Sequence, residues 1–512
     1  MLVFAAPPAI AADPVAGAVV SVSAGANGAQ RMKYRIGPFN VIPGQNEIGF
    51  QVIAQKPQVD GWITRIRPDL VYTNGKVPGV DVIHLHHGVW LNLSRRDATA
   101  PGLPQRFFAA GEEKTIGKFP KGYGYEYEAS DQWLLNHMIH NLTPVPAQVY
   151  MVYEIDFIPK SSPQARGIKP VRPIWMDVQN GRIYPVFNVE KGAGRKGLYT
   201  FPRDEPDPYG PRGRRNEWVV DRSGVLVATA GHLHPGGLHT DLWLRRPGET
   251  VRKASCASRR LASARRRCRE NAPRGHGSNA HLFRSDAKYF EPAGAVSWDV
   301  AMTGTPSDWR VKLRKGDVLW TSATYGTKRG AWWESMGIMV AYMADTGPGK
   351  NPFNRRVSFP GRPTHGHLAE NDNHGGDTVE LPDARKLPDG AAPGAAIDIL
   401  NFKYTLGDLS LAGQGRLPPV VPQGHSLTFR NADDGKRVYH SLTSCKAPCN
   451  RSTGIAYPIA DGPVQFESNT LGSKGPPATG ALEWQTPTNL DRGTYTYFCR
   501  IHPFMRGAFR VK

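Results

Sequence analysis

The chain ends in the stretch TYTYFCRIHPFMRGAFRVK, residues 494–512, and this stretch decides the fold class of its surroundings. Alternating polar and aromatic residues predict a strand that leads to Cys499, and GAFRV predicts a closing strand. The short loop between them presents Cys499, His502 and Met505. A mononuclear blue-copper site needs one thiolate, two imidazoles and a weak axial thioether. We predict that His440, which follows an earlier strand, is the fourth ligand.

The loop CRIHPFMRG closely resembles the ligand loop of amicyanin-like and plastocyanin-like cupredoxins, and the resemblance covers residues 396–512. It implies a small β-sandwich that carries type 1 copper, whose usual work is outer-sphere electron transfer. Simple packing of a turn is the alternative, and it explains this spacing poorly.

The composition of the whole chain favours an all-β fold. Gly 55 and Pro 44 separate many short Val, Ile, Tyr and Trp runs within 512 residues, enough for about three or four domains. No apolar run is long enough to predict a membrane-spanning segment.

The net charge of +20 is not evenly spread, since residues 252–274 contain nine Lys and Arg and one acid, Glu270. This segment is either a basic surface loop that binds anions or membrane, or a local insertion or frame error in the gene. We therefore predict no nucleic-acid partner from it.

The beginning of the chain and its cysteines bear on the compartment. MLVFAAPPAIAADP resembles the tail of a secretory signal with a cut site near Ala11 or Ala12, and a disordered tail is the alternative reading. Two disulfides are plausible in an oxidising compartment, with one thiol left over. We expect a secreted, periplasmic or cell-surface protein, with pairs Cys256 with Cys268 and Cys445 with Cys449, and Cys499 unpaired.

Three histidine clusters lie upstream: HLHH at 84–87, NHMIHNLT at 136–143 and AGHLHPGGLHTDLW at 230–243. Neutral imidazole is a common metal ligand that suits copper. Residues i and i+2 of a strand share a face, so His232 and His234 can reach one ion. By the same logic His84 pairs with His86, and the adjacent His87 points away unless a bulge turns it.

The order of these clusters, followed by GDVLWTSATYGTKRGAWWESMGIMVAYM, resembles the copper type II, ascorbate-dependent monooxygenases, the peptidylglycine α-hydroxylating and dopamine β-monooxygenase family. The resemblance covers residues 40–345. It implies an electron-donating copper held by His86, His87 and His140, and an oxygen-binding copper held by His232, His234 and Met336. Second choices are His84, as a supporting residue or alternative ligand, His137, His239 and, in place of Met336, Met339.

The implied architecture is two jelly-roll-like β-sandwich domains facing each other across a solvent cleft, followed by the cupredoxin. The family anchors a peptide carboxylate with an Arg, an Asn and a Tyr, but the matching residues here are Ala230, Ile338 and Val340. A peptide C-terminus is therefore a poor candidate substrate. The expected segments are a leader remnant or tail 1–30, sandwiches 31–165 and 166–346, a linker 347–395 and the cupredoxin 396–512.

The leading hypothesis is a secreted copper monooxygenase that uses O₂, an organic substrate, three coppers and a built-in or external electron donor. One alternative is a cell-envelope copper-binding or electron-transfer protein without turnover. A nitrite-reductase-like enzyme would need a second Cys-His loop, and the sequence contains none. A hydrolase is not supported either, because the usual hydrolase motifs are absent from the sequence. In the linker, His365, His367 and His374 are either a further metal or docking site or part of a solvated spacer.

Overall fold

The fold of the chain is seen in a computed structural model. The described residues are 19–42, 48–80, 82–143, 145–182, 185–252, 256, 261–290, 300–328, 332–364, 380–436, 438–450, 464–473, 480–502 and 504–512. Strands account for 47% of the structure and helices for 6%, which confirms the predicted all-β class. His365, His367 and His374 lie outside the described residues.

The first group of strands forms a sandwich of two antiparallel sheets. Residues of alternating polarity bury Trp90, Trp133 and Tyr153 between the sheets. One sheet contains β1 (Ser21–Ala24), β2 (Gln30–Val41), β10 (Ala147–Pro159), β4 (Gly61–Tyr72), β7 (Gly117–Lys118) and β8 (Tyr123–Tyr127). The other has the order β3 (Ile48–Ile53), β9 (Trp133–Asn141), β5 (Ile83–Arg96) and β6 (Pro104–Gly111).

The second group builds another sandwich, and β11 joins the two groups by pairing in parallel with β8. One sheet contains β11 (Lys169–Asp177), β23 (Ile338–Ala344), β15 (Gly224–His232), β19 (Val300–Gly304), β20 (Val311–Leu313) and β24 (Arg362–Pro363). The facing sheet contains β13 (Leu198–Phe201), β14 (Glu217–Val219), β21 (Val318–Gly326), β16 (Gly237–Arg245), β18 (Asn279–Tyr289) and β17 (Gly275–His276). A small separate pair consists of β12 (Phe187–Val189) and β22 (Trp332–Ser335).

The C-terminal group is a third, smaller sandwich around buried Phe429, Tyr497 and Phe509. Its first sheet has the order β26 (Lys403–Tyr404), β25 (Ile397–Leu400), β28 (Thr428–Asn431) and β30 (Glu483–Gln485). Its second has the order β27 (Val420–Val421), β32 (Arg506–Val511), β31 (Gly493–Phe498) and β29 (Thr443–Cys445). Short 3₁₀ turns lie at Ala26–Gly28, Pro163–Ala165, Gly210–Arg212, Ala384–Lys386, Gly413–Arg416 and Asp434–Lys436.

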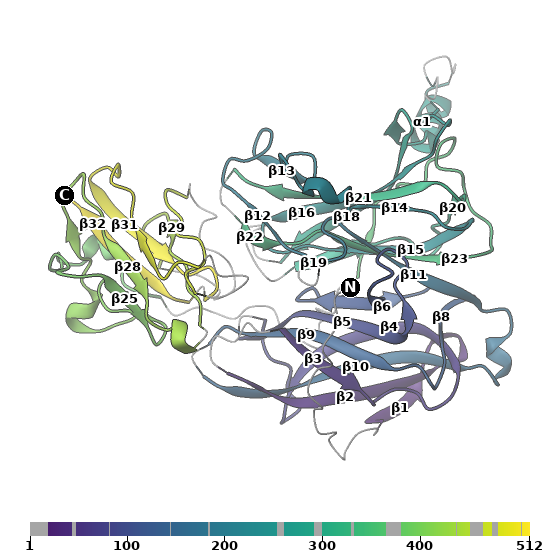
Figure 1. Cartoon of the computed structure of the whole chain (residues 1–512), viewed down its shortest axis with the longest axis horizontal. Coiled ribbons are helices and arrows are strands. Elements are labelled where there is room, and N and C mark those ends of the chain that lie inside the picture. The colour runs from purple at the N-terminus through teal and green to yellow at the C-terminus, as the bar shows by residue number, and fades with distance from the viewer. Residues whose placement is uncertain are drawn as a thin grey trace.

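The C-terminal sandwich lies at one end of the molecule, beside both other sandwiches (Figure 1). One apolar cluster contains Phe187 of the second sandwich together with Val464 and Phe498 of the third. The Lys191 ammonium group also donates a hydrogen bond to the carbonyl oxygen of Val464. These contacts bring the Cys499 loop toward the histidine clusters.

Three segments differ from their predicted character. Within the expected leader or tail 1–30, Ser21–Ala24 is strand β1 and pairs with β2, because its backbone completes the edge of the first sheet. Within the expected linker 347–395, Phe353 and Val357 are buried in the core of the second sandwich. The basic segment 252–274 contains the helix α1 (Ala262–Asn271), which projects from the second sandwich (Figure 1).

Both predicted disulfides are confirmed. Cys256 is bonded to Cys268 and Cys445 to Cys449, while Cys499 is free and buried. The structure contains no helix, among its described residues, of the length and apolarity needed to cross a membrane.

Candidate metal centres

The C-terminal site brings His440, Cys499 and His502 together beneath the surface, with Met505 buried in the same core. The Cys499 Sγ atom lies 3.9 Å from Nδ1 of His440 and 3.7 Å from Nδ1 of His502. Both histidines and Cys499 are fully buried, and Met505 is 2% exposed. Within the described part of the chain these three residues are the one group of His, Cys, Asp or Glu with mutually close ligand atoms. This donor set fits copper.

Neighbouring groups hold these ligands in place. The Asp433 carboxylate lies 3.2 Å from Nε2 of His440, which directs Nδ1 toward the thiol. The backbone N–H of Ser441 donates to Cys499 Sγ at 3.3 Å. Burial alone would raise the pKa of the Cys499 thiol, but the contacts with His440 and with backbone N–H groups lower it below its ordinary value. A thiol with a lowered pKa is prepared to bind a metal as thiolate.

A second cluster of buried imidazoles comes from β5 and β9 of the first sandwich. His84 is the cross-strand partner of His140, and their ring centroids are 5.1 Å apart. His86 lies 6.3 Å from His140 and 6.4 Å from His84. Burial lowers the pKa of His84 to about 4 and keeps His86 and His140 far below their ordinary pKa values. The neutral form that burial favours is the form that binds metal.

A β-bulge in β5 brings the rings of His86 and His87 close together. The register of β5 against β9 shifts between Leu85 and His87, so the adjacent ring centroids of His86 and His87 lie 5.8 Å apart. His87 Nε2 also lies 2.8 Å from the side-chain oxygen of Asn136. Its Nδ1 is buried and has no hydrogen-bond partner in the described residues. The ring of His84, which the resemblance ranked second, lies nearer to the His140 ring than the ring of His86 does.

The second sandwich contributes His232, His234 and Met336 at the adjoining ends of β15 and β23. The ring centroids of His232 and His234 are 5.0 Å apart. The buried hydroxyl of Tyr325 accepts hydrogen bonds from the backbone N–H groups of His234 and Met336 and donates to the Met336 carbonyl. Tyr325 thereby ties the backbone of His234 to the backbone of Met336. Met339, the alternative to Met336, is buried in the core instead.

Glu113 connects the first sandwich to this group. Its carboxylate lies 3.1 Å from Nδ1 of His232 and also accepts the backbone N–H of Gly111. Burial would raise the pKa of Glu113, but the charge and hydrogen bond of His232 lower it below its ordinary value. The Nε2 atom of His232 is buried and, among described residues, has no hydrogen-bond partner. A carboxylate that holds one ring nitrogen leaves the other available to a metal.

The imidazoles of the three sandwiches form a continuous group. The ring centroids of His502 and His140 lie 6.3 Å apart, and those of His86 and His234 lie 4.7 Å apart. The sequence placed these residues in three separate sites. The structure places them in one buried row that runs from the Cys499 loop to His232.

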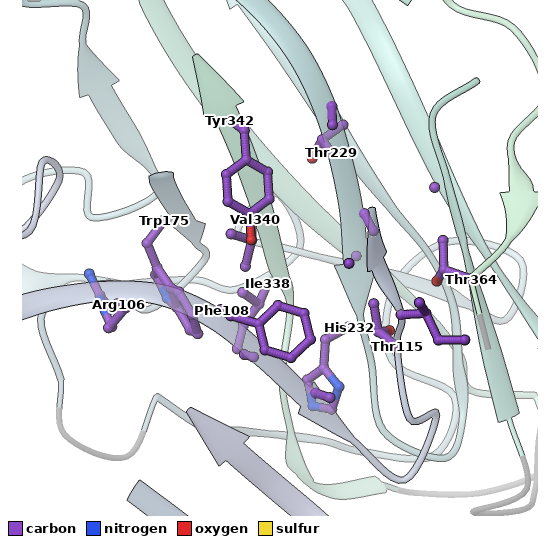
Figure 2. A pocket seen from close by; sticks show the side chains of 18 of the residues that line it. Arg106, Phe108, Thr115, Trp175, Thr229, His232, Ile338, Val340, Tyr342 and Thr364 are labelled. Atoms are coloured by element: carbon purple, nitrogen blue, oxygen red, sulfur yellow. The ribbon is translucent and has the colours of Figure 1, made fainter. Parts of the chain in front are cut away.

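A cavity of about 1170 Å³ lies between the first two sandwiches and reaches His87, His232 and Met336. Its aromatic walls include Phe108, Trp175 and Tyr342 (Figure 2). Its floor contains the three residues expected in place of the peptide anchor, with Ala230 paired to Val340 and Ile338 paired to His232.

The two remaining histidine candidates lie apart from this row. The His137 ring packs against Phe39 at 4.5 Å between centroids, while His239 forms an ion pair with Asp241 at 2.9 Å. Asp241 also contacts His281 at 2.6 Å. Burial opposes ionisation of Asp241, but its hydrogen bonds with both histidines and Arg284 lower its pKa. These contacts account for His239 as part of a hydrogen-bond network around the buried carboxylate of Asp241.

Sequence reasoning missed Glu113, Tyr325 and Asp433, which orient the candidate ligands. Each acts on a ligand at a position that only the folded chain brings close, and Tyr325 lay unnoticed in the predicted hairpin before Met336. No local motif marks Glu113 or Asp433, and the hairpin motif that contains Tyr325 gave no sign of its orienting role.

The chain matches no protein-family model and no curated protein. Among solved structures, a Cu(I) form of an amicyanin mutant is 22% identical with a TM-score of 0.13, and the match covers 27% of this chain and 96% of amicyanin. A copper-containing nitrite reductase from Thermus scotoductus SA-01 is 15% identical with a TM-score of 0.15, covering 57% of this chain and 58% of that protein. At these values the likeness does not extend to activity.

Proposed function

We propose that the chain is a secreted copper-dependent oxidoreductase of the monooxygenase type, with a type 1 copper electron-transfer domain at its C-terminus. The observation that carries the proposal is the buried row of imidazoles between the Cys499 site and the cavity. Export is supported by the two disulfides, which persist in oxidising compartments.

The residues divide the work by position. His440, Cys499, His502 and Met505 would hold the type 1 copper, and the buried histidines with Met336 would hold further copper. Bound copper supplies one-electron transfer at the first site and O₂-dependent oxidation at the cavity. Glu113 and Tyr325 orient His232, His234 and Met336, and the apolar walls exclude water from the substrate.

The structure affects the choice of ligands differently at the two upstream sites. His86 and His140 remain in the electron-donating set, with His84 and His87 as the residues that complete it. His232, His234 and Met336 remain the oxygen-binding set. His234 and Met336 share the Tyr325 hydrogen bonds, and His232 and Met336 border the cavity.

The first test is copper per chain and the visible spectrum of the wild type, Cys499→Ala and Met336→Ala. We expect Cys499→Ala to lose one copper and the intense thiolate-to-copper band. Met336→Ala should keep that band and lose copper at the cavity together with O₂ consumption. Unchanged copper and O₂ consumption in Met336→Ala would overturn the oxidoreductase, and bound copper without turnover in the wild type would favour a copper-binding protein.

The electron route has its own test. Copper held by the Cys499 site would exchange one electron with copper held by the buried imidazoles. His140 is the ring next to His502. In His140→Phe we expect the reduced type 1 copper to reoxidise about tenfold more slowly with an unchanged spectrum. His137→Phe on the same strand is the matched control, since its ring packs against Phe39. Equal rates in both variants would reject His140 as the junction.

A further inference from the structure

The cavity that reaches His232 and Met336 has mainly apolar walls and a charged rim. The walls are mainly apolar, and some of their polar atoms already have partners within the protein. The Tyr342 hydroxyl donates to the Phe107 carbonyl at 2.9 Å, so its ring is the part that remains for a ligand. A ligand body inside this cavity gains by apolar contact and finds few hydrogen-bonding groups on the walls.

An arginine packs against the aromatic wall, and its own hydrogen-bond donors bind other protein groups. The Arg106 guanidinium carbon lies 4.7 Å from the centre of the Trp175 ring. Its nitrogens bind the Asp97 carboxylate at 2.8 Å and the Asn180 side-chain oxygen at 2.9 Å. Arg106 therefore supports Trp175, and Trp175 packs in turn beside Met336 and Ile338.

Among the described residues, the rim of the cavity carries more positive than negative charge. Exposed cations at the edge of the cavity form no ion pair with another described residue, and the exposed acid of the same rim is Asp308. The cations are Lys118, Lys121, Arg182 and Arg362. An anionic group at the mouth would be attracted by them, while a cation would be repelled.

We infer that the substrate class is an amphiphilic anion: a long or multi-ring apolar body with one carboxylate or similar group at its end. The inference rests on the proposed function, because it takes the cavity as the place where oxidation occurs. At about 1170 Å³ the cavity exceeds the roughly 300–1,000 Å³ of common small-molecule pockets, which leaves room for such a body. The anionic end lies at the rim, and the apolar body extends toward His232 and Met336.

The experiment measures binding of dodecanoate, dodecylamine and 1-dodecanol to the full-length protein by titration calorimetry below their micelle concentrations. We expect dodecanoate to bind most tightly and dodecylamine most weakly. In Lys118→Glu/Lys121→Glu the dissociation constant of dodecanoate should rise about fivefold or more, since one charge pair at the surface is worth about 1 kcal/mol. Lys76→Glu, an exposed lysine away from the cavity, should change nothing.

A further variant tests the floor: Ala230→Trp should abolish binding of both dodecanoate and 1-dodecanol. Should that variant fail to fold, the rim variants decide alone. Equal or tighter binding of dodecylamine, or dodecanoate binding that is insensitive to the rim variants, would overturn the inference. Copper content and the visible band of the same samples separate this outcome from failure of the proposed function, because fatty-acid binding does not require copper.

Discussion

The Tyr325 hydroxyl ties two candidate ligands, His234 and Met336, to each other. Replacing it with Phe leaves the buried N–H groups of His234 and Met336 and the Met336 carbonyl without this partner. We expect Tyr325→Phe to lower the free energy of unfolding by about 1–3 kcal/mol and to weaken copper binding at the cavity. Urea unfolding and copper titration measure both effects.

Tyr342→Phe provides the matched control for that prediction. Its hydroxyl has one partner, the Phe107 carbonyl, and touches neither ligand backbone. It should lose about 1 kcal/mol or less and keep its copper affinity. Equal copper affinity in Tyr325→Phe and the wild type would show that the hydroxyl does not position the ligands.

The sequence predicts individual ligands best where one loop supplies several of them. Cys499, His502 and Met505 lie within seven residues, so their spacing alone indicated the site that the structure contains. Glu113 is 119 positions from His232, and no spacing rule reaches that far. Such orienting residues depend on how the sandwiches pack.

At the scale of single strands, the bulge in β5 decides where the first cluster points. Simple alternation predicts that His84 and His86 share a face and that His87 leaves it. The extra residue opposite Met138 instead keeps the His86 and His87 rings close. A bulge is a local choice of the backbone that hydropathy alternation cannot show.

The same strands make the protein sensitive to acid. Burial lowers the pKa values of His84, His87 and His137 on β5 and β9 to about 4, below the ordinary 6.5. Their neutral forms favour folding fully above pH 6.5, and this contribution is lost as pH falls toward 4. We expect each of these three histidines to lower the free energy of unfolding by roughly 2 kcal/mol as the pH falls from 7 to 5.

His137→Gln isolates one part of that acid sensitivity. Since glutamine does not titrate, the variant should lose less stability than the wild type over the same pH interval. Urea unfolding of the copper-chelated protein at the two pH values provides the comparison. A variant with the same loss as the wild type would remove His137 from the set.

At the scale of the whole molecule, the proposed electron donor and acceptor sites belong to one chain. Electron transfer from the Cys499 site is then intramolecular, and its rate should not change over an about tenfold range of protein concentration. Stopped-flow reoxidation of the type 1 copper measures this rate. A rate proportional to concentration would indicate transfer between separate molecules.

The predicted order of three sandwiches agrees with the strand groups, whereas the limits between them stay a prediction. Composition indicated short strands and turns, but it could not assign Ser21–Ala24 to an edge or Phe353 to a core. Helix α1 was also unforeseen, because its Arg-rich sequence has no apolar face of the usual kind. Segments at the borders of domains take their structure from neighbours distant in the chain.

The burial of His502 beside His140 restricts the choice of redox partners. A diffusing oxidant cannot touch a ring that the protein covers completely. In electrical terms, the proposed output terminal of the C-terminal site is enclosed within the molecule. We therefore expect an outside reductant to approach another face of that sandwich, and stray acceptors to draw little current from it.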